Sequence, residues 1–149
     1  MPITMNIRGI TKDDYEYVVS VLDDWWGGPA GQGAHPIFFH ELGQEALIAE
    51  NEGAIVGFLF GFVAPTDPRT GYVHLVGIHP EHRRGGVGKS LYARFIENCA
   101  SAGASQMKAI TTPGNDGSVR FHEALGFSVN SDSHYAGRDR SRIIFTKDL

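Results

Sequence analysis

The amino-acid sequence predicts a mixed α/β fold, with a central, largely antiparallel sheet of about six or seven strands flanked by helices. Apolar runs separated only by short turns fill residues 46–80, which is typical of antiparallel strands. Between residues 87 and 127, helical periodicity alternates with strand-like runs, which adds strand–helix–strand units. The 149 residues contain no repeat or linker, so we expect one domain, residues 1–149, with its own core.

The first part of the chain is expected to form one strand and two helices. Residues 3–9 alternate weakly and indicate a short strand. A helix should follow with Thr11 as its N-cap, because apolar residues recur at helical spacing from Tyr15 to Leu22. The glycine-rich stretch 27–36 breaks this helix and is expected to be a mobile loop, with a short helix at 38–42.

The rest of the chain should supply the remaining strands and two longer helices. Two apolar runs flank Asn51-Glu52-Gly53, a pattern typical of a β-hairpin. Apolar residues recur at helical spacing from Val87 to Cys99, and Gly126 provides the stop signal of a later helix. The expected strands are residues 46–50, 54–64, 72–80, 105–112, 127–129 and 142–146, and the expected helices are residues 87–102 and 115–125.

Composition narrows the classes of partner and compartment. The net charge of −4 argues against a nonspecific nucleic-acid surface. We find no apolar stretch long enough to cross a membrane and no apolar signal core at the N-terminus, so we expect no membrane partner. The single cysteine, Cys99, rules out an internal disulfide and fits a reducing compartment. A cytoplasmic location is therefore expected.

The turn between the strand ending near residue 80 and the following helix is both cationic and glycine-rich. It reads HPEHRRGGVGKS from His79 to Ser90. Backbone N–H groups of such a turn converge at the positive end of the helix dipole, where a phosphate or pyrophosphate binds. Glycines permit close approach of the ligand, and cationic side chains add charge-assisted hydrogen bonds. The candidate cations are Arg83, Arg84 and Lys89.

The turn also resembles other glycine-rich motifs. Gly88-Lys89-Ser90 ends like the P-loop of a nucleotide-binding protein, but that motif needs glycine where Arg83 stands. No later strand ends in an obvious Mg²⁺-binding aspartate, and the G-x-G-x-x-G pattern of dinucleotide-binding proteins also fails. The remaining alternative is a glycine-rich helix start that binds no ligand.

Two segments together resemble the GCN5-related N-acetyltransferase (GNAT) superfamily. Arg83-x-x-Gly86-x-Gly88, after VGIHPEH and before GKSLYARF, resembles the acetyl-CoA pyrophosphate loop of that family. Residues 115–118 with Phe121 and EALGF resemble its N-x-x-(A/S)…F-Y-x-x-x-G-F segment. Both stand in the family's order and separation, and the expected element order extends the resemblance over nearly the whole chain. The resemblance implies acetyl-CoA as co-substrate and no metal.

The resemblance also implies which residues hold the cofactor. The strand before the turn would pair its backbone with the pantetheine arm, and one of its N–H groups would donate to the thioester carbonyl. The turn would hold the pyrophosphate, and the helix of the second segment would supply further residues that bind the cofactor. Together the expected cofactor-binding residues are Val76, Gly77, Ile78, Arg83, Arg84, Gly85, Gly86, Val87, Gly88, Lys89, Asn115 and Ser118.

His74 is the candidate general base. An acceptor amine must lose a proton, and an imidazole with a pKa near 6.5 is suited to take it. His74 lies two residues from Val76, so its side chain is expected on the same face of the strand. It also matches a position where some members of the family carry a histidine, while Tyr72 stands where others carry a glutamate. The alternatives are a buried structural histidine and a water relay.

His122 is the candidate general acid for the departing thiolate. In the family this place most often holds a tyrosine, so His122 is the clearest departure from the pattern. A histidine can donate a proton, although its reach and pKa differ from those of a phenol. Tyr135 is a weaker candidate for the same role.

The segment 25–40 occupies the place of the family's variable acceptor-binding loop. Trp25, Trp26 and His35 are the candidate acceptor-binding residues, with the tryptophans forming an aromatic wall or a cation–π face. The alternative is that both tryptophans cover the core. The pairs His35 with His40 and His79 with His82 lack a third ligand, so no metal site is expected.

These observations favour an acetyl-CoA-dependent N-acetyltransferase. The primary amine of a small-molecule or peptide acceptor would attack the thioester directly in a ternary complex, and family resemblance makes a homodimer a fair expectation. Two alternatives stay open. One is a non-catalytic acyl-CoA-binding module, suggested by the missing glutamate and tyrosine. The other is a P-loop-like nucleotide-binding protein.

Overall fold

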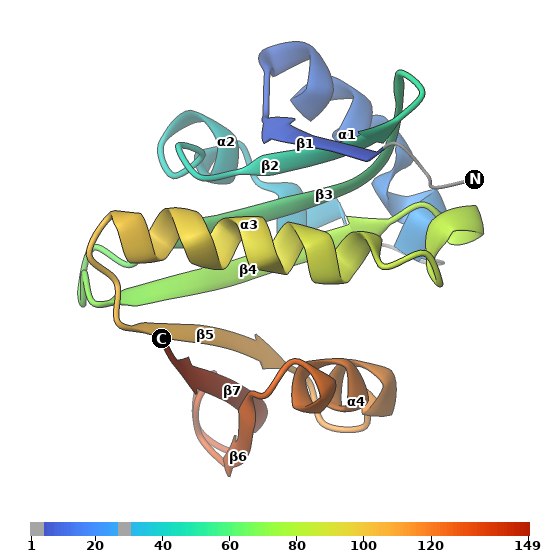
Figure 1. Ribbon diagram of the computed structural model, residues 1–149. Coiled ribbons are helices and arrows are strands. Elements are labelled where there is room, and N and C mark those ends of the chain that lie inside the picture. Colours follow the sequence, from blue (N-terminus) through green and yellow to red (C-terminus); the bar gives the residue numbers. More distant parts are fainter. Residues whose placement is uncertain (1–4, 27–30) are drawn as a thin grey trace.

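The computed structural model describes residues 5–26 and 31–149, which form a seven-stranded mixed sheet flanked by four α-helices (Figure 1). The strand order is β1-β2-β3-β4-β5-β7-β6, and every pairing is antiparallel except that of β4 with β5. The fold class predicted from the sequence is confirmed. The strands are β1 (Met5–Gly9), β2 (Leu47–Asn51), β3 (Ala54–Val63), β4 (Thr70–Ile78), β5 (Gln106–Thr111), β6 (Ser128–Asp132) and β7 (Arg142–Asp148).

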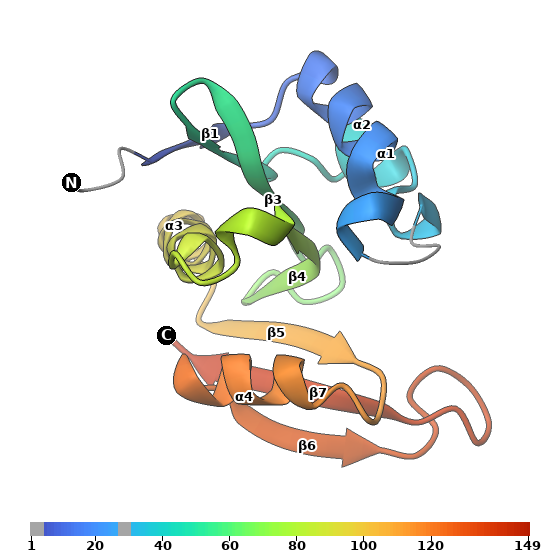
Figure 2. The same ribbon diagram turned by 90° about the vertical axis from the view of Figure 1, so that its right-hand side faces the viewer.

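The helices cover both faces of the sheet (Figure 2). One core cluster packs α3 and α4 against the sheet, with fully buried Leu91, Phe95 and Phe145 at its centre. The other packs α1 and α2 against the opposite face, around Leu22 and Phe58. The helices are α1 (Lys12–Trp26), α2 (Ile37–His40), α3 (Val87–Ser101) and α4 (Asp116–Ala124), with 3₁₀ turns at Gly31–Ala34 and Pro80–His82.

The parallel pair β4–β5 is the point where the sheet opens. The two strands pair only from Thr70 with Gln106 to Val73 with Ala109. Beyond this register β4 continues to Ile78 while paired with β3 alone, and the strands diverge in Figure 1. The last five residues of β4 therefore present one backbone edge to the space between the strands.

A local sequence signal explains where α1 begins. Thr11 caps α1 as predicted, because its hydroxyl accepts the Asp14 N–H at 3.3 Å and the Asp14 carboxylate accepts the Thr11 N–H at 2.7 Å.

The mobile loop expected at residues 27–36 is not what the described part shows, because Gly31–Ala34 forms a 3₁₀ turn. Residues 27–30 lie outside the described residues. Among the described residues, no helix is long and apolar enough to cross a bilayer.

Candidate active site

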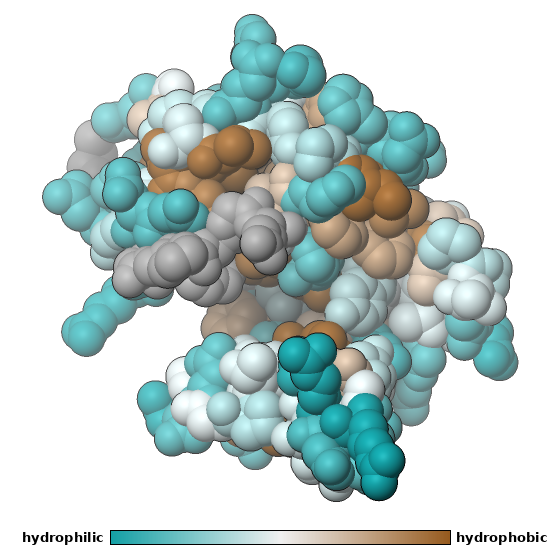
Figure 3. Space-filling model, turned by 180° about the vertical axis from the view of Figure 1, so that it is seen from behind, coloured by the Kyte–Doolittle hydropathy of each residue, from teal (hydrophilic) through white to brown (hydrophobic). Residues whose placement is uncertain are grey.

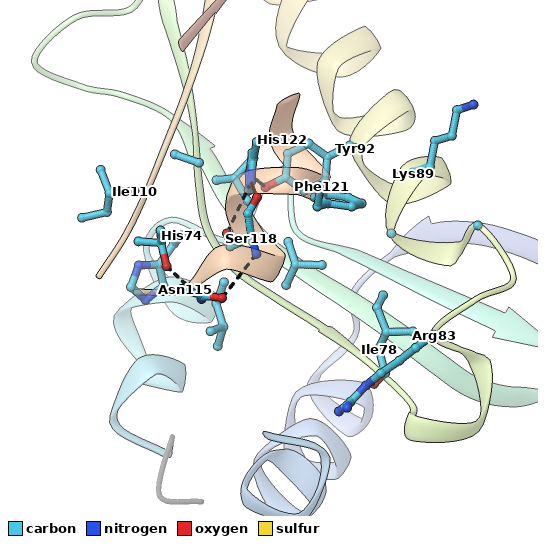
Figure 4. A pocket seen from close by; sticks show the side chains of 17 residues that line it. His74, Ile78, Arg83, Lys89, Tyr92, Ile110, Asn115, Ser118, Phe121 and His122 are labelled. Carbon is cyan, nitrogen blue, oxygen red and sulfur yellow. Dashed lines mark hydrogen bonds between the residues drawn. The ribbon is translucent and has the colours of Figure 1, made fainter. Parts of the chain in front are cut away.

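A cavity of about 450 Å³ crosses the sheet where β4 and β5 diverge (Figure 4). Arg83 and Lys89, from the glycine-rich turn, lie on one side of it, and His74 and Ile110 lie on the other. Its wall is closed by α3 and α4, which contribute the side chains of Tyr92, Ser118, Phe121 and His122. The cavity thus joins the α3/α4 face of the sheet to the α1/α2 face.

The glycine-rich turn opens directly into α3. Gly86 is the N-cap of the helix in the left-handed conformation (φ 79°), and an added Cβ would meet open space there. The first intrahelical bond runs from the Ser90 N–H to the Gly86 carbonyl, so the preceding N–H groups have no acceptor in the helix. Gly86, Gly88 and Lys89 line the cavity, so the free N–H groups of this helix start, called the anion cradle below, can bind an anion there.

The other turn residues take different positions. Val87 is 5% exposed and its side chain packs in the core, so only its backbone can serve a ligand. Arg83 donates from Nη2 to the Trp25 carbonyl and from Nε to the Ile78 carbonyl at 3.4 Å, which ties the turn to the end of α1. Arg84 and Gly85 do not line the main cavity in the described part of the chain.

The end of β4 forms the floor of the cleft. Val76 and Ile78 line the cavity, and both pack on the α3 side of the sheet. Gly77 faces the opposite side, where an added Cβ would lie 2.4 Å from the Phe58 ring, so a side chain there would displace the core. An extended ligand laid against the open edge of this segment would find unpaired backbone groups.

The predicted orientation of His74 is wrong, and a β-bulge is the reason. Phe60 pairs with Leu75 and Gly61 pairs with Val73, so His74 is one extra residue in β4. The bulge shifts the alternation of side chains along the strand. Val76 therefore packs on the α3 side, whereas the His74 ring stacks on Phe38 of α2, on the other side of the sheet.

The contacts of His74 fix its protonation pattern. Its Nε2 lies 2.8 Å from the Gly33 carbonyl, which can only accept, so Nε2 carries the proton and Nδ1 keeps a lone pair. The ring is stacked on Phe38 with centroids 3.7 Å apart. Burial lowers the pKa of His74 below its usual 6.5, so the imidazole is neutral at pH 7. These are the properties of a general base.

His122 lies in a closed hydrogen-bond chain. Its Nδ1 donates to the Ser118 carbonyl at 2.8 Å, so its Nε2 accepts the Tyr92 hydroxyl proton at 2.7 Å. The ring is 6% exposed and stacks on Phe145 at 3.9 Å. Burial lowers the pKa of His122 and raises that of Tyr92, so both groups are neutral at pH 7.

Asn115 and Ser118 belong to the cap of α4. The Asn115 side chain accepts the Ser118 N–H at 3.3 Å and donates to the Thr111 hydroxyl at 3.0 Å. Both residues line the cavity (Figure 4). The cap thus joins the end of β5 to the start of α4 at the cavity wall.

Of the predicted acceptor-binding residues whose side chains are described, neither Trp25 nor His35 lines the cavity beside His74. Trp25 is 5% exposed and stacks on Phe58, which matches the alternative that it covers the core. The side chain of Trp26 lies outside the described residues. His35 is exposed, accepts the Ile37 N–H, and does not line the main cavity within the described chain. The described residues contain no group of three or more potential metal ligands.

Sequence reasoning missed Tyr92 and Phe38 as residues of the site. Tyr92 lies one position after Leu91 on the apolar face of α3, where it was counted only as part of the helix. A phenol buried in a core needs a hydrogen-bond partner, so its presence there was the available signal. Phe38 carried no comparable signal, because its contact with His74 joins helix α2 to strand β4, which are distant in the sequence.

Comparisons with known proteins agree with this geometry. The model of the acetyltransferase (GNAT) family matches residues 14–127, which is more than half of the chain. The chain therefore belongs to the GNAT family. This confirms the resemblance found in the turn and in the segment after β5.

Individual relatives are more distant. An L-methionine sulfoximine/L-methionine sulfone acetyltransferase of Salmonella typhimurium is 33% identical over 98 residues, covering 64% of this chain and 57% of the relative. A phosphinothricin N-acetyltransferase of Streptomyces viridochromogenes is 32% identical over 95 residues, covering 61% and 51%. The chain thus spans about half the length of these curated relatives.

Solved structures share the fold. A phosphinothricin acetyltransferase from Sinorhizobium meliloti, in complex with acetyl-CoA, superposes with a TM-score of 0.77. The match covers 99% of this chain and 89% of that one, at 19% identity. At this identity the likeness shows the fold alone.

Proposed function

We propose that this protein is an acetyl-CoA-dependent N-acetyltransferase that acetylates a primary amine by direct attack in a ternary complex. One observation carries the proposal. The cavity between β4 and β5 has an anion cradle on one face of the sheet and a neutral, base-competent histidine on the other. Family membership and relatives named as N-acetyltransferases support it.

Acetyl-CoA would lie across the α3/α4 face. Its pyrophosphate would accept hydrogen bonds from the N–H groups at the start of α3, helped by the helix dipole. The pantetheine arm would pair with the open edge of β4 from Val76 to Ile78. Asn115 and Ser118 would line the opposite wall. Arg84 and Lys89 would add charge, and Arg83 would hold the turn against α1.

The acetyl group would then be transferred in one addition and one elimination. The amine nitrogen forms a bond to the thioester carbon, and a backbone N–H of the Val76–Ile78 segment stabilises the oxygen that becomes negative. His74 Nδ1 accepts the N–H proton, since its Nε2–H is held by the Gly33 carbonyl. The C–S bond breaks, and the CoA thiolate leaves with the electron pair.

The general-acid role of His122 stays a prediction, and the contacts of its ring favour a structural role. Its one proton goes to the Ser118 carbonyl, and its Nε2 is occupied by the Tyr92 hydroxyl. A thiol with a pKa near 8.5 is a tolerable leaving group without an acid near neutral pH. We therefore assign the Tyr92–His122 pair to shaping the cavity wall.

The proposed acceptor is a small molecule or peptide with a primary amine. The relatives named for methionine sulfoximine and phosphinothricin act on small amino-acid-like compounds, which supports a small acceptor. We also propose a cytoplasmic location, in keeping with the single buried thiol of Cys99, and a homodimer on the family resemblance.

The test is a thermal-shift titration followed by a transfer assay. Acetyl-CoA at about 100 times its Kd should add roughly 2.7 kcal/mol to folded-state stability, a shift of a few degrees, whereas Mg·ATP should give none. Acetyl-CoA and a panel of primary amines should then release CoA thiol in step with amide formation. Stabilisation by ATP alone would overturn the proposal. Binding of acetyl-CoA without transfer to any amine would reduce the protein to an acyl-CoA-binding module.

A further inference from the structure

A row of aromatic rings leads away from His74 on the α1/α2 face of the sheet. His74 stacks on Phe38 of α2 at 3.7 Å, and Phe38 lies 6.4 Å from Phe62 of β3 with the rings 20° apart. Phe62 in turn lies 5.4 Å from Tyr72 of β4. The rings come from three elements, so the row exists only in the folded protein.

These rings are not fully covered by the core. All four are half-buried, unlike the completely buried phenylalanines that pack beneath α1 and α3. Figure 3 shows this face hollowed between the part built on α1 and α2 and the part built on β5 to β7, with apolar residues gathered over α2. The exposed part of such a ring, beside a reaction centre, binds an apolar group favourably because both are then removed from water.

The far end of the row carries positive charge. Lys108 pairs with Tyr72 in the parallel register of β4 and β5, and its Nζ lies 4.8 Å from the centre of the Tyr135 ring; burial, with a smaller contribution from Tyr135, raises the pKa of Tyr72 to about 12. A second ammonium reaching this end would therefore meet Lys108.

We propose that the acceptor is a primary monoamine carrying an aromatic or extended apolar group, which packs on the row from Phe38 to Tyr72. The inference rests on the proposed function and names its substrate class. The amine would lie at His74 Nδ1, and the apolar group would extend toward Phe62 and Tyr72. Diamines and polyamines would be poor acceptors, because their distal ammonium would approach Lys108.

The experiment compares acceptors of similar length at saturating acetyl-CoA. The set is 2-phenylethylamine, n-hexylamine, 1,5-diaminopentane and L-methionine sulfone, with amide formation as the readout. We expect kcat/KM for the first two to exceed that for the diamine and the amino acid by about tenfold or more, the factor that 1.4 kcal/mol provides.

The variants locate the preference in the row. Phe62→Leu keeps an apolar side chain but loses the flat ring, and should raise KM for 2-phenylethylamine about tenfold with little change in kcat. Tyr17→Leu is the matched control, because Tyr17 is an exposed aromatic on α1 outside the row, and it should leave KM unchanged. Lys108→Gln should improve kcat/KM for the diamine alone.

The outcomes distinguish a failure of this inference about the acceptor from a failure of the proposed acetyltransferase function. If the diamine or the amino acid is the better acceptor, or if Phe62→Leu changes KM no more than Tyr17→Leu does, the row does not bind the acceptor, and the acetyltransferase proposal stands. If none of the four amines, nor any in the wider panel, is acetylated although acetyl-CoA binds, the proposed function fails first.

Discussion

At His74, strand β4 carries one residue more than its neighbour β3, so that the imidazole lies on the α1/α2 face while Val76, two residues on, lies on the α3 face. Without the bulge Val76 would share the α1/α2 face with His74. The Gly33 carbonyl then holds Nε2–H and leaves Nδ1 free to accept a proton. A local irregularity of the strand therefore brings His74 and Val76, from opposite faces of the sheet, to one cavity.

The Tyr92–His122 pair is predicted to act on stability more than on turnover. Tyr92→Phe keeps the ring but leaves the buried Nε2 of His122 without its donor, which should lower the free energy of unfolding by about 1–3 kcal/mol. Denaturant unfolding measures this loss, and kcat should stay within a few-fold of wild type. A hundredfold fall in kcat with unchanged stability would instead place the pair in proton donation to the thiolate.

At the scale of elements, the start of α3 should show that its glycine serves the ligand. Gly86→Ala places a Cβ in the open space before the helix, and the acetyl-CoA Kd should rise by about tenfold or more, because the N–H groups could no longer approach the pyrophosphate. Isothermal titration gives the Kd. Gly53→Ala is the control, since Gly53 also has positive φ (82°) and open space but lies in the β2–β3 turn.

That control separates strain from ligand contact. Both variants force alanine into the left-handed region, so both should lose about 1–2 kcal/mol of stability. Only Gly86→Ala should weaken acetyl-CoA binding. Equal Kd values for the two variants would show that the turn does not hold the cofactor.

The cap of α1 should confer a pH-dependent stability. Arg8 donates to the Asp14 carboxylate at 2.6 and 2.9 Å and lowers its pKa from 3.8 to about 2. A lowered carboxyl pKa stabilises the fold above pH 3.8, and this contribution disappears as the pH falls toward 2. Asp14→Asn should therefore cost about 2 kcal/mol at pH 7 and almost nothing near pH 2.

The exposed neighbour Asp13 provides the matched variant for this measurement. Asp13→Asn changes the same charge in the same helical turn, but it should alter the denaturation midpoint far less at pH 7. If the two variants lose equal stability at every pH, the ion pair of Arg8 with Asp14 contributes nothing specific.

Signals that lie within one element could be predicted from the sequence. The cap at Thr11 and the glycine turn before α3 were predicted and confirmed, because each depends on residues close in the chain. The polar strand β6 (Ser128–Asp132) was predicted too short, since SVNSD has little apolar alternation. The bulge at His74 leaves no mark in composition, and the Tyr92–His122 contact joins residues 30 positions apart.

For the whole molecule, the divergence of β4 from β5 creates the site. The strands pair over four residues and then separate, so a cavity reaches from the anion cradle beside α3 to His74 beside α2. The sequence predicted a strand–helix–strand order around this point but not that the pairing would stop at Val73. The residue at which the pairing of β4 with β5 stops depends on how the two halves of the sheet pack in the folded protein.

The most direct test of this account is the pH profile of acetyl transfer, expressed per free amine, for wild type and His74→Gln. Because burial lowers the pKa of His74, the wild-type rate should rise through a limb below pH 6.5 and stay high above it. In His74→Gln that limb should vanish, and kcat should fall by about 10²–10⁴-fold while acetyl-CoA affinity is kept. An unchanged profile in the variant would contradict the account, because the cavity would then have no base on its acceptor side.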